Sequence, residues 1–295
     1  MPAPDGLLVV DKHAGPTSHD VVNRLRRLFA TKRVGHAGTL DPPATGILLV
    51  GLERATRILQ FLQVLPKTYR AEVAFGTTTS TQDATGTVLE ERPCRFGLDD
   101  LRGAAAAMVG EIHQVPPMVS AVRVGGERLY RAARRGEEVE RPARAVTVYA
   151  LDVARFDATA GEATLEVRCS SGTYVRTLAA DIGERLGCGG HLTALRRTSV
   201  GSLGEADAVT VAQLDSMDPD ARRAAVLPMQ TALRDYESLT VSGDELRAVS
   251  HGRSLGDPDP HGAEGSPVAV LDPDGHLLAV YRRQGAGFRP AVVLA

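Results

Sequence analysis

The sequence predicts an α+β fold with a mostly antiparallel mixed sheet flanked by helices. Strand-like and helix-like segments follow one another without a regular βαβ rhythm, which disfavours a parallel sheet. Apolar residues make up 43% of the 295 residues and charged residues 24%, as is usual for a soluble globular protein. The sequence contains no Gly-x-Gly-x-x-Gly loop, no Walker-type loop and no evident internal repeat, so it does not indicate a nucleotide-binding or solenoid architecture.

The N-terminal part contains several elements with clear signals. Thr17-Ser18 can cap a helix, because Val21, Val22, Leu25, Leu28 and Phe29 fall on one face at helical spacing. In chain order we expect a buried strand at residues 7–11, that helix, a Gly- and Pro-rich loop at 35–46, a strand at 47–50, a helix at 54–62, a strand at 69–75, a Thr-rich loop at 76–86, and an alanine-rich helix that Asp99 caps and that runs to Val109.

The second half turns to strands from Val146 onward, including residues 163–169. A helix follows, in which Val175, Leu178, Ala179, Ile182 and Leu186 share a face. Acidic and small residues dominate near residues 203–235, and a capping box at Ser242–Glu245 then opens a short helix that Gly252 ends. Small strands around an Asp-Pro-Asp-Gly turn fill residues 267–294. We therefore predict a large domain over residues 1–230 and a small β-rich domain over residues 231–295.

Charge and composition restrict the location and partners. The longest strongly apolar run, at residues 47–50, is too short to span a membrane, and residues 7–10 lead straight into charged residues, unlike a signal peptide. Three scattered cysteines favour the cytoplasm over a disulfide framework or a zinc site. The net charge is −2, but two basic clusters are compatible either with phosphate contacts or with ordinary solvated helix faces. They comprise Arg24, Arg26, Arg27, Lys32 and Arg33, and Arg123, Arg128, Arg131, Arg134 and Arg135.

The densest chemical signal lies between Gly35 and Gly46. Three glycines and two prolines surround one carboxylate, Asp41, and indicate a backbone held in an unusual shape. A carboxylate on a rigid loop can act as a nucleophile, a general base or an electrostatic stabiliser. An isolated Asp-Pro would more often be a simple turn with a satisfied side chain.

This loop resembles the signature of the TruB family of tRNA pseudouridine synthases, Gly-His-x-Gly-x-Leu-Asp-Pro-x-Ala-x-Gly, at every fixed position. Four further segments resemble family motifs in the same order. They are Asp11-Lys12 with Gly15, where His13 replaces the usual Pro; Lys67–Arg70 with Gly76 and Asp83; Pro116–Ala121 through Tyr130 and Arg134, where Arg123 replaces the usual Lys; and Cys169–Arg176, which the basic segment His191–Arg197 follows. The resemblance is good over residues 5–200 and weak over the last 60.

The resemblance implies a pseudouridine synthase fold, a small PUA-like C-terminal domain and an RNA-gripping insertion at about residues 116–145. It also implies three catalytic residues: Asp41, Arg176 to hold Asp41 ionised, and Tyr69 to stack on uracil and to accept the proton from C5. The implied RNA-binding residues are His36, Lys12, Asp83, Tyr174, Leu195, Arg123, Arg128 and Arg131. Alternatives stay open for several of them: Asp83 as a turn former, Lys12 as an anchor for backbone or for phosphate, and Leu195 as a core residue.

The implied activity is conversion of uridine 55 in the tRNA T-loop to pseudouridine after base flipping. The rearrangement moves the ribose C1′ from N1 to C5 of the same uracil, so neither a metal nor an organic cofactor is expected. The expected partner is tRNA, through its T-loop and acceptor arm, and we expect a monomer without an obligatory protein partner. The rival interpretations are a relative that works on guide-RNA complexes and a non-catalytic RNA-binding or tRNA-folding protein. The short C-terminus disfavours the first, and the complete set of Asp41, Tyr69 and Arg176 disfavours the second.

Overall fold

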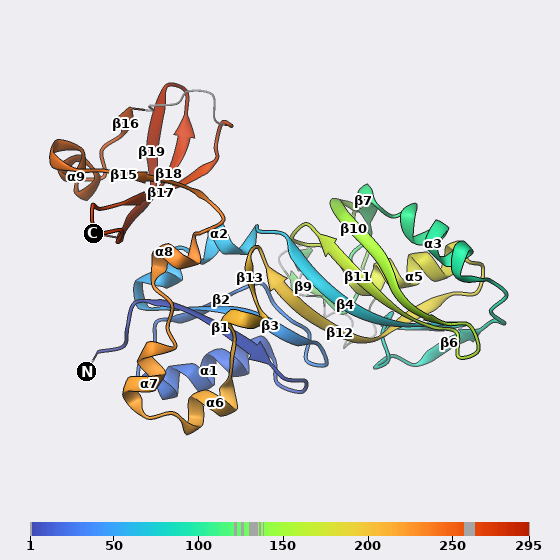
Figure 1. Cartoon of the computed structure of the whole chain (residues 1–295). Helices are drawn as coiled ribbons and strands as arrows, with labels where there is room; N and C mark the ends of the chain where they lie inside the picture. Colours follow the sequence, from blue (N-terminus) through green and yellow to red (C-terminus); the bar gives the residue numbers. More distant parts are fainter. Residues whose placement is uncertain are drawn as a thin grey trace. The chain divides into compact units, whose positions relative to one another are not determined.

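Residue contacts divide the computed structural model of the chain into two compact units (Figure 1). The structure describes residues 2–120, 123–124, 127–129, 135, 137, 139–256 and 263–294. The terminal unit comprises Met1–Leu65 and Ser199–Ala295, and the central unit comprises Pro66–Thr198. Asp41 therefore belongs to the terminal unit, whereas Tyr69 and Arg176 belong to the central unit.

Part of the 10-stranded sheet that the described residues form lies in the terminal unit. β1 (Gly6–Lys12) pairs antiparallel with β3 (Thr45–Leu52), and β3 also pairs antiparallel with β2 (Val34–Ala37). β14 (Val209–Thr210) adds a parallel partner to β1. Both β1 and β3 are buried on their two faces, which explains why they appear in the sequence as continuous apolar runs.

Helix α1 (Ser18–Leu28) covers one face of this sheet. Its N-terminus has a capping box, in which the side chain of Thr17 accepts from the N–H of Asp20 and the Asp20 carboxylate accepts from the N–H of Thr17. The predicted helix and its apolar face are confirmed. The face packs in one cluster with alternate strand residues, which comprises Val21, Val22, Leu25 and Phe29 of the helix segment and Leu8, Val10, Leu48 and Val50 of the strands.

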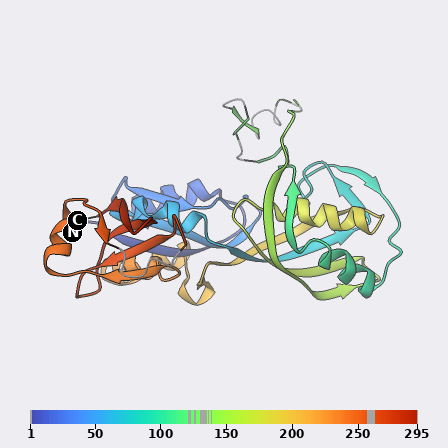
Figure 2. The ribbon, with the colours of Figure 1, turned by 90° about the horizontal axis from the view of Figure 1, so that it is seen from above.

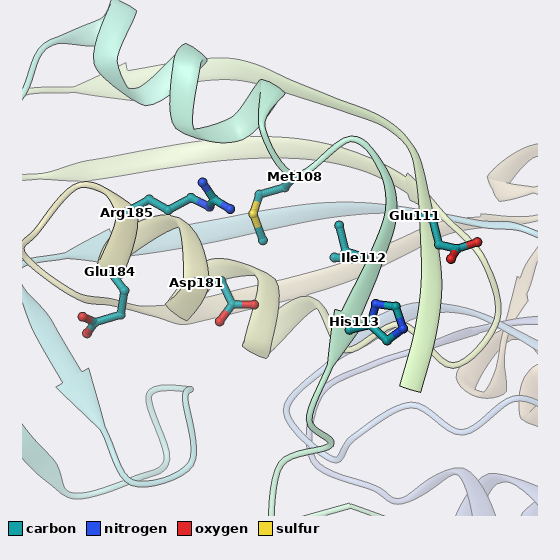
Figure 3. A pocket seen from close by; sticks show the side chains of 7 residues that line it. All are labelled: Met108, Glu111, Ile112, His113, Asp181, Glu184 and Arg185. Carbon is teal, nitrogen blue, oxygen red and sulfur yellow. The ribbon is translucent and has the colours of Figure 1, made fainter. Parts of the chain in front are cut away.

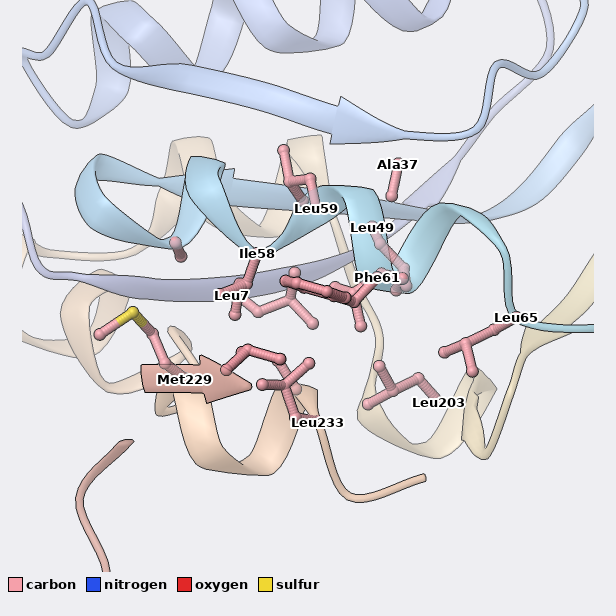
Figure 4. Close-up of a cluster of buried hydrophobic side chains, with 14 of the residues drawn as sticks. Leu7, Ala37, Leu49, Ile58, Leu59, Phe61, Leu65, Leu203, Met229 and Leu233 are labelled. Carbon is pink, nitrogen blue, oxygen red and sulfur yellow. The ribbon is translucent and has the colours of Figure 1, made fainter. Parts of the chain in front are cut away.

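The opposite face of β1 and β3 is buried in a second cluster, part of which Figure 4 shows. Leu7, Leu49 and Phe61 contribute from the N-terminal segments, and Met229 and Leu233 contribute from the segment that returns. The same cluster includes residues of the C-terminal sheet, namely Ala269, Leu277, Val280, Val292 and Leu294. Full burial of each large aliphatic side chain contributes roughly 1.5–3 kcal/mol, so this shared core couples the C-terminal sheet to the N-terminal segments.

The C-terminal residues form a separate sheet with the order β15-β17-β18-β19-β16. β15 pairs parallel with β17, and the other pairs are antiparallel. Its elements are β15 (Glu237–Thr240), α9 (Gly243–Ser250), β16 (Leu255–Gly256), β17 (Pro267–Leu271), β18 (Leu277–Gln284) and β19 (Gly287–Val293). The phenol of Tyr236 donates to the carbonyl oxygen of Phe61 over 2.6 Å, and Arg54 donates to that of Leu294 over 2.7 Å. The predicted β-rich C-terminal part is confirmed, whereas the domain boundary at residues 230–231 stays a prediction.

In the central unit, strands of the 10-stranded sheet follow the order β12-β4-β11-β10-β7, and the pairs β4–β11, β11–β10 and β10–β7 are antiparallel. Helices α3 and α5 contact each other, and they contact β10 and β4 respectively (Figure 2). The main elements are β4 (Lys67–Phe75), α3 (Leu98–Ala106), β7 (Gly110–Gln114), β10 (Arg144–Asp157), β11 (Glu162–Cys169), α5 (Val175–Arg185) and β12 (Gly190–Val200). Two short antiparallel pairs accompany them: β5 (Thr77–Thr79) with β6 (Val88–Glu91), and β8 (Arg123–Val124) with β9 (Glu127–Arg128).

Several short elements complete the terminal unit. They are η1 (Glu53–Arg57), α2 (Leu59–Gln63), β13 (Leu203–Gly204), η2 (Glu205–Asp207), α6 (Val211–Ser216), α7 (Pro219–Ala224) and α8 (Met229–Ala232). The predicted α+β class with mostly antiparallel pairing is confirmed. Within the described residues, no helix is long and apolar enough to cross a membrane.

The segment predicted to be helical at residues 54–62 is helical but divided into a 3₁₀ turn, η1, and the short α2, because apolar spacing alone does not separate 3₁₀ from α turns. Two predicted helix caps were wrong. Asp99 does not cap α3: Gly97 is the N-cap, and Asp100 accepts its N–H over 2.8 Å. Ser242 precedes α9 in an extended conformation, and its side chain makes no capping hydrogen bond.

Candidate active site

Asp41 lies half-buried in the loop that joins β2 to β3. Its carbonyl oxygen accepts the N–H of Ala44 over 3.0 Å, which closes a turn directly after the carboxylate. Gly38 and Gly46, on either side, have φ angles of +87° and +97°, a region that favours glycine. Two of the three glycines predicted to shape this loop therefore occupy positions that other residues would strain.

The residue before Asp41 is fixed by Ser18. The Ser18 hydroxyl accepts the N–H of Leu40 over 2.9 Å and lies 3.2 Å from the Leu40 carbonyl oxygen, to which it donates. Ser18 and Leu40 are both buried, 2% and 3% exposed. The N–H and the carbonyl oxygen of Leu40 thus both bond to the Ser18 hydroxyl, and the first turn of α1 fixes the position of that hydroxyl.

The residue after Asp41 is fixed by Lys12 and Gly15. The carbonyl oxygen of Pro42 accepts the N–H of Gly15 over 2.8 Å and the ammonium group of Lys12 over 3.1 Å. Lys12 is fully buried and also donates to the carbonyl oxygens of His13 and Pro16, each over 3.0 Å. Of the two alternatives for Lys12, these bonds favour the one in which it orients the backbone beside Asp41.

Tyr69 lies on β4 in the central unit and is only 8% exposed. Its antiparallel partner on β11 is Val167. Residues at alternate positions of β4 share a face, so Lys67 lies on the same face as Tyr69. Lys67 is 4% exposed, and burial, followed by the neighbouring charge of Arg197, lowers the pKa of its ammonium group to about 8. Sequence reasoning assigned no role to Lys67, although its place two residues before Tyr69 already predicts a shared face.

Arg176 lies in the first turn of α5 and forms a buried ion pair with Asp83. Its Nη1 lies 3.1 Å from Oδ2 of Asp83, and the two residues are 5% and 8% exposed. The guanidinium also donates to the carbonyl oxygens of Thr81 over 3.2 Å and Val119 over 2.9 Å. A cation at a helix N-terminus opposes the helix dipole, and the Asp83 carboxylate offsets that cost.

Asp83 combines this ion pair with the turn-forming role weighed for it. Its Oδ1 accepts the hydroxyls of Thr81 over 2.7 Å and Thr85 over 2.6 Å, and the N–H of Thr85 over 3.0 Å. Burial alone would raise the pKa of this carboxyl group. The hydrogen bonds from Thr85 and Thr81, together with the charge of Arg176, outweigh burial and lower the pKa below its usual value. The carboxylate is therefore ionised at neutral pH.

The other predicted residues are placed less decisively. Tyr174 is the N-cap residue of α5, and its N–H and carbonyl oxygen both bond to the side-chain amide of Gln114, over 2.9 and 3.2 Å. His36 on β2 and Leu195 on β12 are each half-buried. Their roles towards RNA stay predictions.

The basic insertion is described only in part. Arg123 and Arg128 pair across the β8–β9 hairpin, and Arg131 and Arg134 lie outside the described residues. In the first basic cluster, Arg24 forms an ion pair with Asp215, and Arg26 donates to the side chain of Asn23 and to the carbonyl oxygen of Val34. Arg33 lies 3.8 Å from a carboxylate oxygen of Glu53. Three arginines of that cluster thus have protein partners, which weakens its interpretation as a phosphate-binding surface.

A groove elsewhere in the central unit encloses about 640 Å³ (Figure 3). Its lining comes from the end of α3, β7 and α5 and comprises Met108, Glu111, Ile112, His113, Asp181, Glu184 and Arg185. It contains none of the residues that the sequence motifs single out. Among the described residues, one group has ligand atoms close enough to hold a metal ion, Asp272, Asp274 and His276 on the turn after β17. Neither feature includes a residue that the motifs identify.

Comparison with protein families matches the whole chain from residue 26 onward. The N-terminal domain of TruB family pseudouridylate synthases matches residues 26–175. The tRNA pseudouridylate synthase B C-terminal domain matches residues 176–234, and the tRNA pseudouridine synthase II C-terminal domain matches residues 236–295.

Individual proteins are similar over nearly their full length. The tRNA pseudouridine synthase B of Thermobifida fusca is 46% identical over 99% of this chain and 99% of its own, and that of Mycobacterium tuberculosis is 46% identical over 98% and 95%. A solved H/ACA RNP bound to a substrate RNA has a chain with a TM-score of 0.75 and 25% identity, covering 98% of this chain and 85% of its own. A chain of a solved archaeal box H/ACA sRNP complex has a TM-score of 0.73 and 26% identity, and the match covers 97% of this chain and 84% of its own. The predicted pseudouridine synthase fold is confirmed, and the chain belongs to the TruB family of pseudouridylate synthases.

Proposed function

We propose that this chain is a tRNA pseudouridine synthase that isomerises uridine 55 of the T-loop, with Asp41 as its essential carboxylate. The observation that carries the proposal is the fixation of the Asp41 loop on both sides, by Ser18 at Leu40 and by Lys12 and Gly15 at Pro42. A turn without a chemical role would not need a buried lysine and a buried hydroxyl to hold its flanking peptides. Such fixation costs nothing at the moment of reaction, which is the condition for efficient catalysis by a charged group.

The reaction breaks the bond between the ribose C1′ and N1 of uracil and joins C1′ to C5 of the same base. The proton on C5 must then leave, while N1 gains a proton. The isomerisation is redox-neutral and transfers no group to a second molecule, so we expect neither a metal nor an organic cofactor. The target uridine has to leave its stack to expose these atoms.

Each catalytic residue supplies one requirement of that reaction. Asp41 supplies the carboxylate beside the sugar. The Arg176 guanidinium, held by Asp83 and two carbonyl oxygens, supplies the cation that the reaction requires. Tyr69 stacks on the uracil, and its phenolate oxygen accepts the proton from C5, which restores the neutral phenol.

RNA recognition uses the T-loop and the acceptor arm of the tRNA. His36, Tyr174 and Leu195 contact the flipped nucleotide and its surroundings, and the insertion with Arg123, Arg128 and Arg131 grips the backbone. Replacing Arg128, Arg131 and Arg134 by Glu should weaken tRNA binding and flatten its salt dependence, because fewer counterions are released. Unchanged affinity and salt slope would exclude the insertion as an RNA clamp.

The chain acts on tRNA as a monomer without an obligatory protein partner, in the cytoplasm where tRNA is found. The solved structures with similar chains belong to H/ACA ribonucleoprotein complexes, whereas the tRNA pseudouridine synthase B relatives share a higher identity over the full chain. Pseudouridine formation by the purified chain alone, without guide RNA, would separate the two modes of action.

The decisive experiment maps pseudouridine in a tRNA transcript after incubation with the purified chain. We expect one modified position, uridine 55, and no product when that nucleotide is replaced by cytidine. Replacement of another uridine in the same loop is the matched control and should leave modification at position 55. Asp41→Asn should bind the transcript nearly as well as the parent and form no pseudouridine, because it keeps the shape and loses the charge. Turnover by Asp41→Asn would exclude the proposed role.

A further inference from the structure

Cys94 and Cys188 approach each other at one backbone contact of the central unit. The N–H of Gly76 donates to the carbonyl oxygen of Gly189 over 3.1 Å, and the thiol of Cys188 donates to the same oxygen over 3.4 Å. A Cβ atom on Gly76 would lie 3.0 Å from the sulfur of Cys94. Both sulfurs therefore lie beside the hydrogen bond between Gly76 and Gly189.

Glycine at position 76 makes this approach possible. Its φ angle is +92°, which disfavours other residues, and any side chain there would have to displace the Cys94 sulfur. Cys94 follows β6, whereas Cys188 follows α5, so the contact joins two segments that are far apart in the sequence.

The surroundings of the two thiols differ in exposure. Burial, followed by a hydrogen bond with the Cys188 thiol, raises the pKa of Cys94 to about 11. Cys94 is partly exposed, and Cys188 is only 1% exposed. Cys94 is thus accessible to a dissolved oxidant, and Cys188 is placed to react second. The third cysteine, Cys169, is fully buried at the end of β11, opposite Lys67.

We propose that Cys94 and Cys188 form an intramolecular disulfide that stabilises the central unit when the protein meets a low-molecular-weight disulfide. The Cys94 thiol first loses its proton, a step that its raised pKa makes slow at neutral pH. The thiolate then attacks one sulfur of that oxidant, forms a mixed disulfide and releases one small thiol. The Cys188 thiolate then attacks the Cys94 sulfur, and the second small thiol leaves. Two protein thiols are oxidised, one small disulfide is reduced to two thiols, and the two thiol protons end on the released thiols.

The bond would close a long loop, from the end of the β5–β6 hairpin to the turn after α5. Closing a long loop removes conformational entropy from the unfolded chain, so a disulfide of good geometry stabilises the folded state. We expect oxidation to raise the midpoint of thermal unfolding by about 5 °C or more.

Tryptic mapping of the full-length chain tests the pairing directly, because arginines place the cysteines on different peptides: Cys94 on residues 71–95, Cys169 on 169–176 and Cys188 on 186–196. The reduced protein is incubated with oxidised glutathione and digested without reductant. We expect a linked species of peptides 71–95 and 186–196 that separates on reduction. A stable glutathione adduct on Cys94, three free thiols, a link that includes Cys169, or links between molecules alone would each overturn the proposal.

Variants provide matched controls. Cys94→Ser should abolish both the linked peptide and the rise in the unfolding midpoint, and Cys94 is preferred because it is the more exposed of the pair. Cys169→Ala removes the third cysteine and should leave the link and the rise intact. A crosslinked parent whose midpoint equals that of the reduced protein would exclude the stabilising role.

Discussion

The hydroxyl of Ser18 bonds to both backbone groups of Leu40, the residue before Asp41. Ser18→Ala would leave a buried N–H and a buried carbonyl oxygen without this partner, which costs about 1–3 kcal/mol of unfolding free energy. It would also release one side of the Asp41 loop. We expect near-parental tRNA binding and a single-turnover rate lower by roughly 10–100-fold, since small displacements of a catalytic group are costly.

Thr17→Ala is the control for Ser18→Ala. It removes the neighbouring cap of α1, which costs about 1 kcal/mol, but it touches neither group of Leu40. Its single-turnover rate should stay near the parental value. Equal losses of rate in the two variants would mean that the start of α1 matters as a whole, and the specific link from Ser18 to Leu40 would be refuted.

The pair of Arg176 and Asp83 predicts a large effect on stability. Asp83→Asn keeps the shape of the side chain but leaves the buried guanidinium without its carboxylate, and loss of one partner of a buried pair costs about 3–5 kcal/mol. Glu166→Gln, which breaks the exposed pair with Arg70, should cost at most about 1 kcal/mol. Urea unfolding of both variants provides the comparison, and similar losses would contradict the importance of the buried pair.

The same pair predicts a pH dependence of known sign. Because the folded-state pKa of Asp83 is lowered, its contribution to stability is present above the unfolded-state pKa and is lost as pH falls through the folded-state pKa. The stability difference between parent and Asp83→Asn should therefore shrink on acidification. A difference that stayed constant between pH 6 and roughly pH 3 would rule out this linkage.

Lys67 predicts a dependence of the same sign, but at alkaline pH. Its folded-state pKa is lowered from 10.5 to about 8, so between these values the unfolded chain binds more protons and stability rises with pH. Below about pH 8 the ammonium group of Lys67 is charged in the folded protein, and burial of this charge lowers the free energy of unfolding by its full amount. Replacement by Met removes that cost, so the stability advantage of Lys67→Met over the parent should shrink from pH 8 towards 10. Lys32→Met, at an exposed lysine, should track the parent at every pH.

Local sequence signals predicted the elements that depend on local periodicity. The apolar spacing from Val21 to Phe29 gave α1, and the apolar runs at residues 7–10 and 47–50 gave β1 and β3. Caps were less predictable, because both Asp99 and Asp100 are suitable and only the extended backbone at Gly97 decides between them. The motifs located Asp41, Tyr69 and Arg176, but not the bonds from Ser18 to Leu40 or from Arg176 to Asp83. Such bonds join distant residues, and local spacing contains no information about them.

The C-terminal sheet provides another test of the fold. Deletion of residues 236–295 would remove Leu277, Val280 and Val292 from the cluster that buries Leu7 and Phe61. We expect the shortened chain to unfold at a much lower temperature or to aggregate, because it exposes a large apolar face. A shortened chain with the parental unfolding midpoint would show that residues 236–295 form an independent domain.

Substitutions of Tyr69 separate stacking from proton transfer. Tyr69→Phe keeps the ring and loses the hydroxyl, whereas Tyr69→Leu loses both. If the phenol accepts the C5 proton, Phe should bind tRNA normally and lose most of the single-turnover rate, by about 10²–10⁴-fold. If the ring serves only for stacking, Phe should be nearly as active as the parent, and Leu should be poor. We expect the first result, because the proposed mechanism gives Asp41 and Arg176 other tasks. Tyr69 also lies on the same strand face as the buried Lys67, whose charge would stabilise a phenolate. A Phe variant with the parental rate would refute the proton role and leave the stacking role intact.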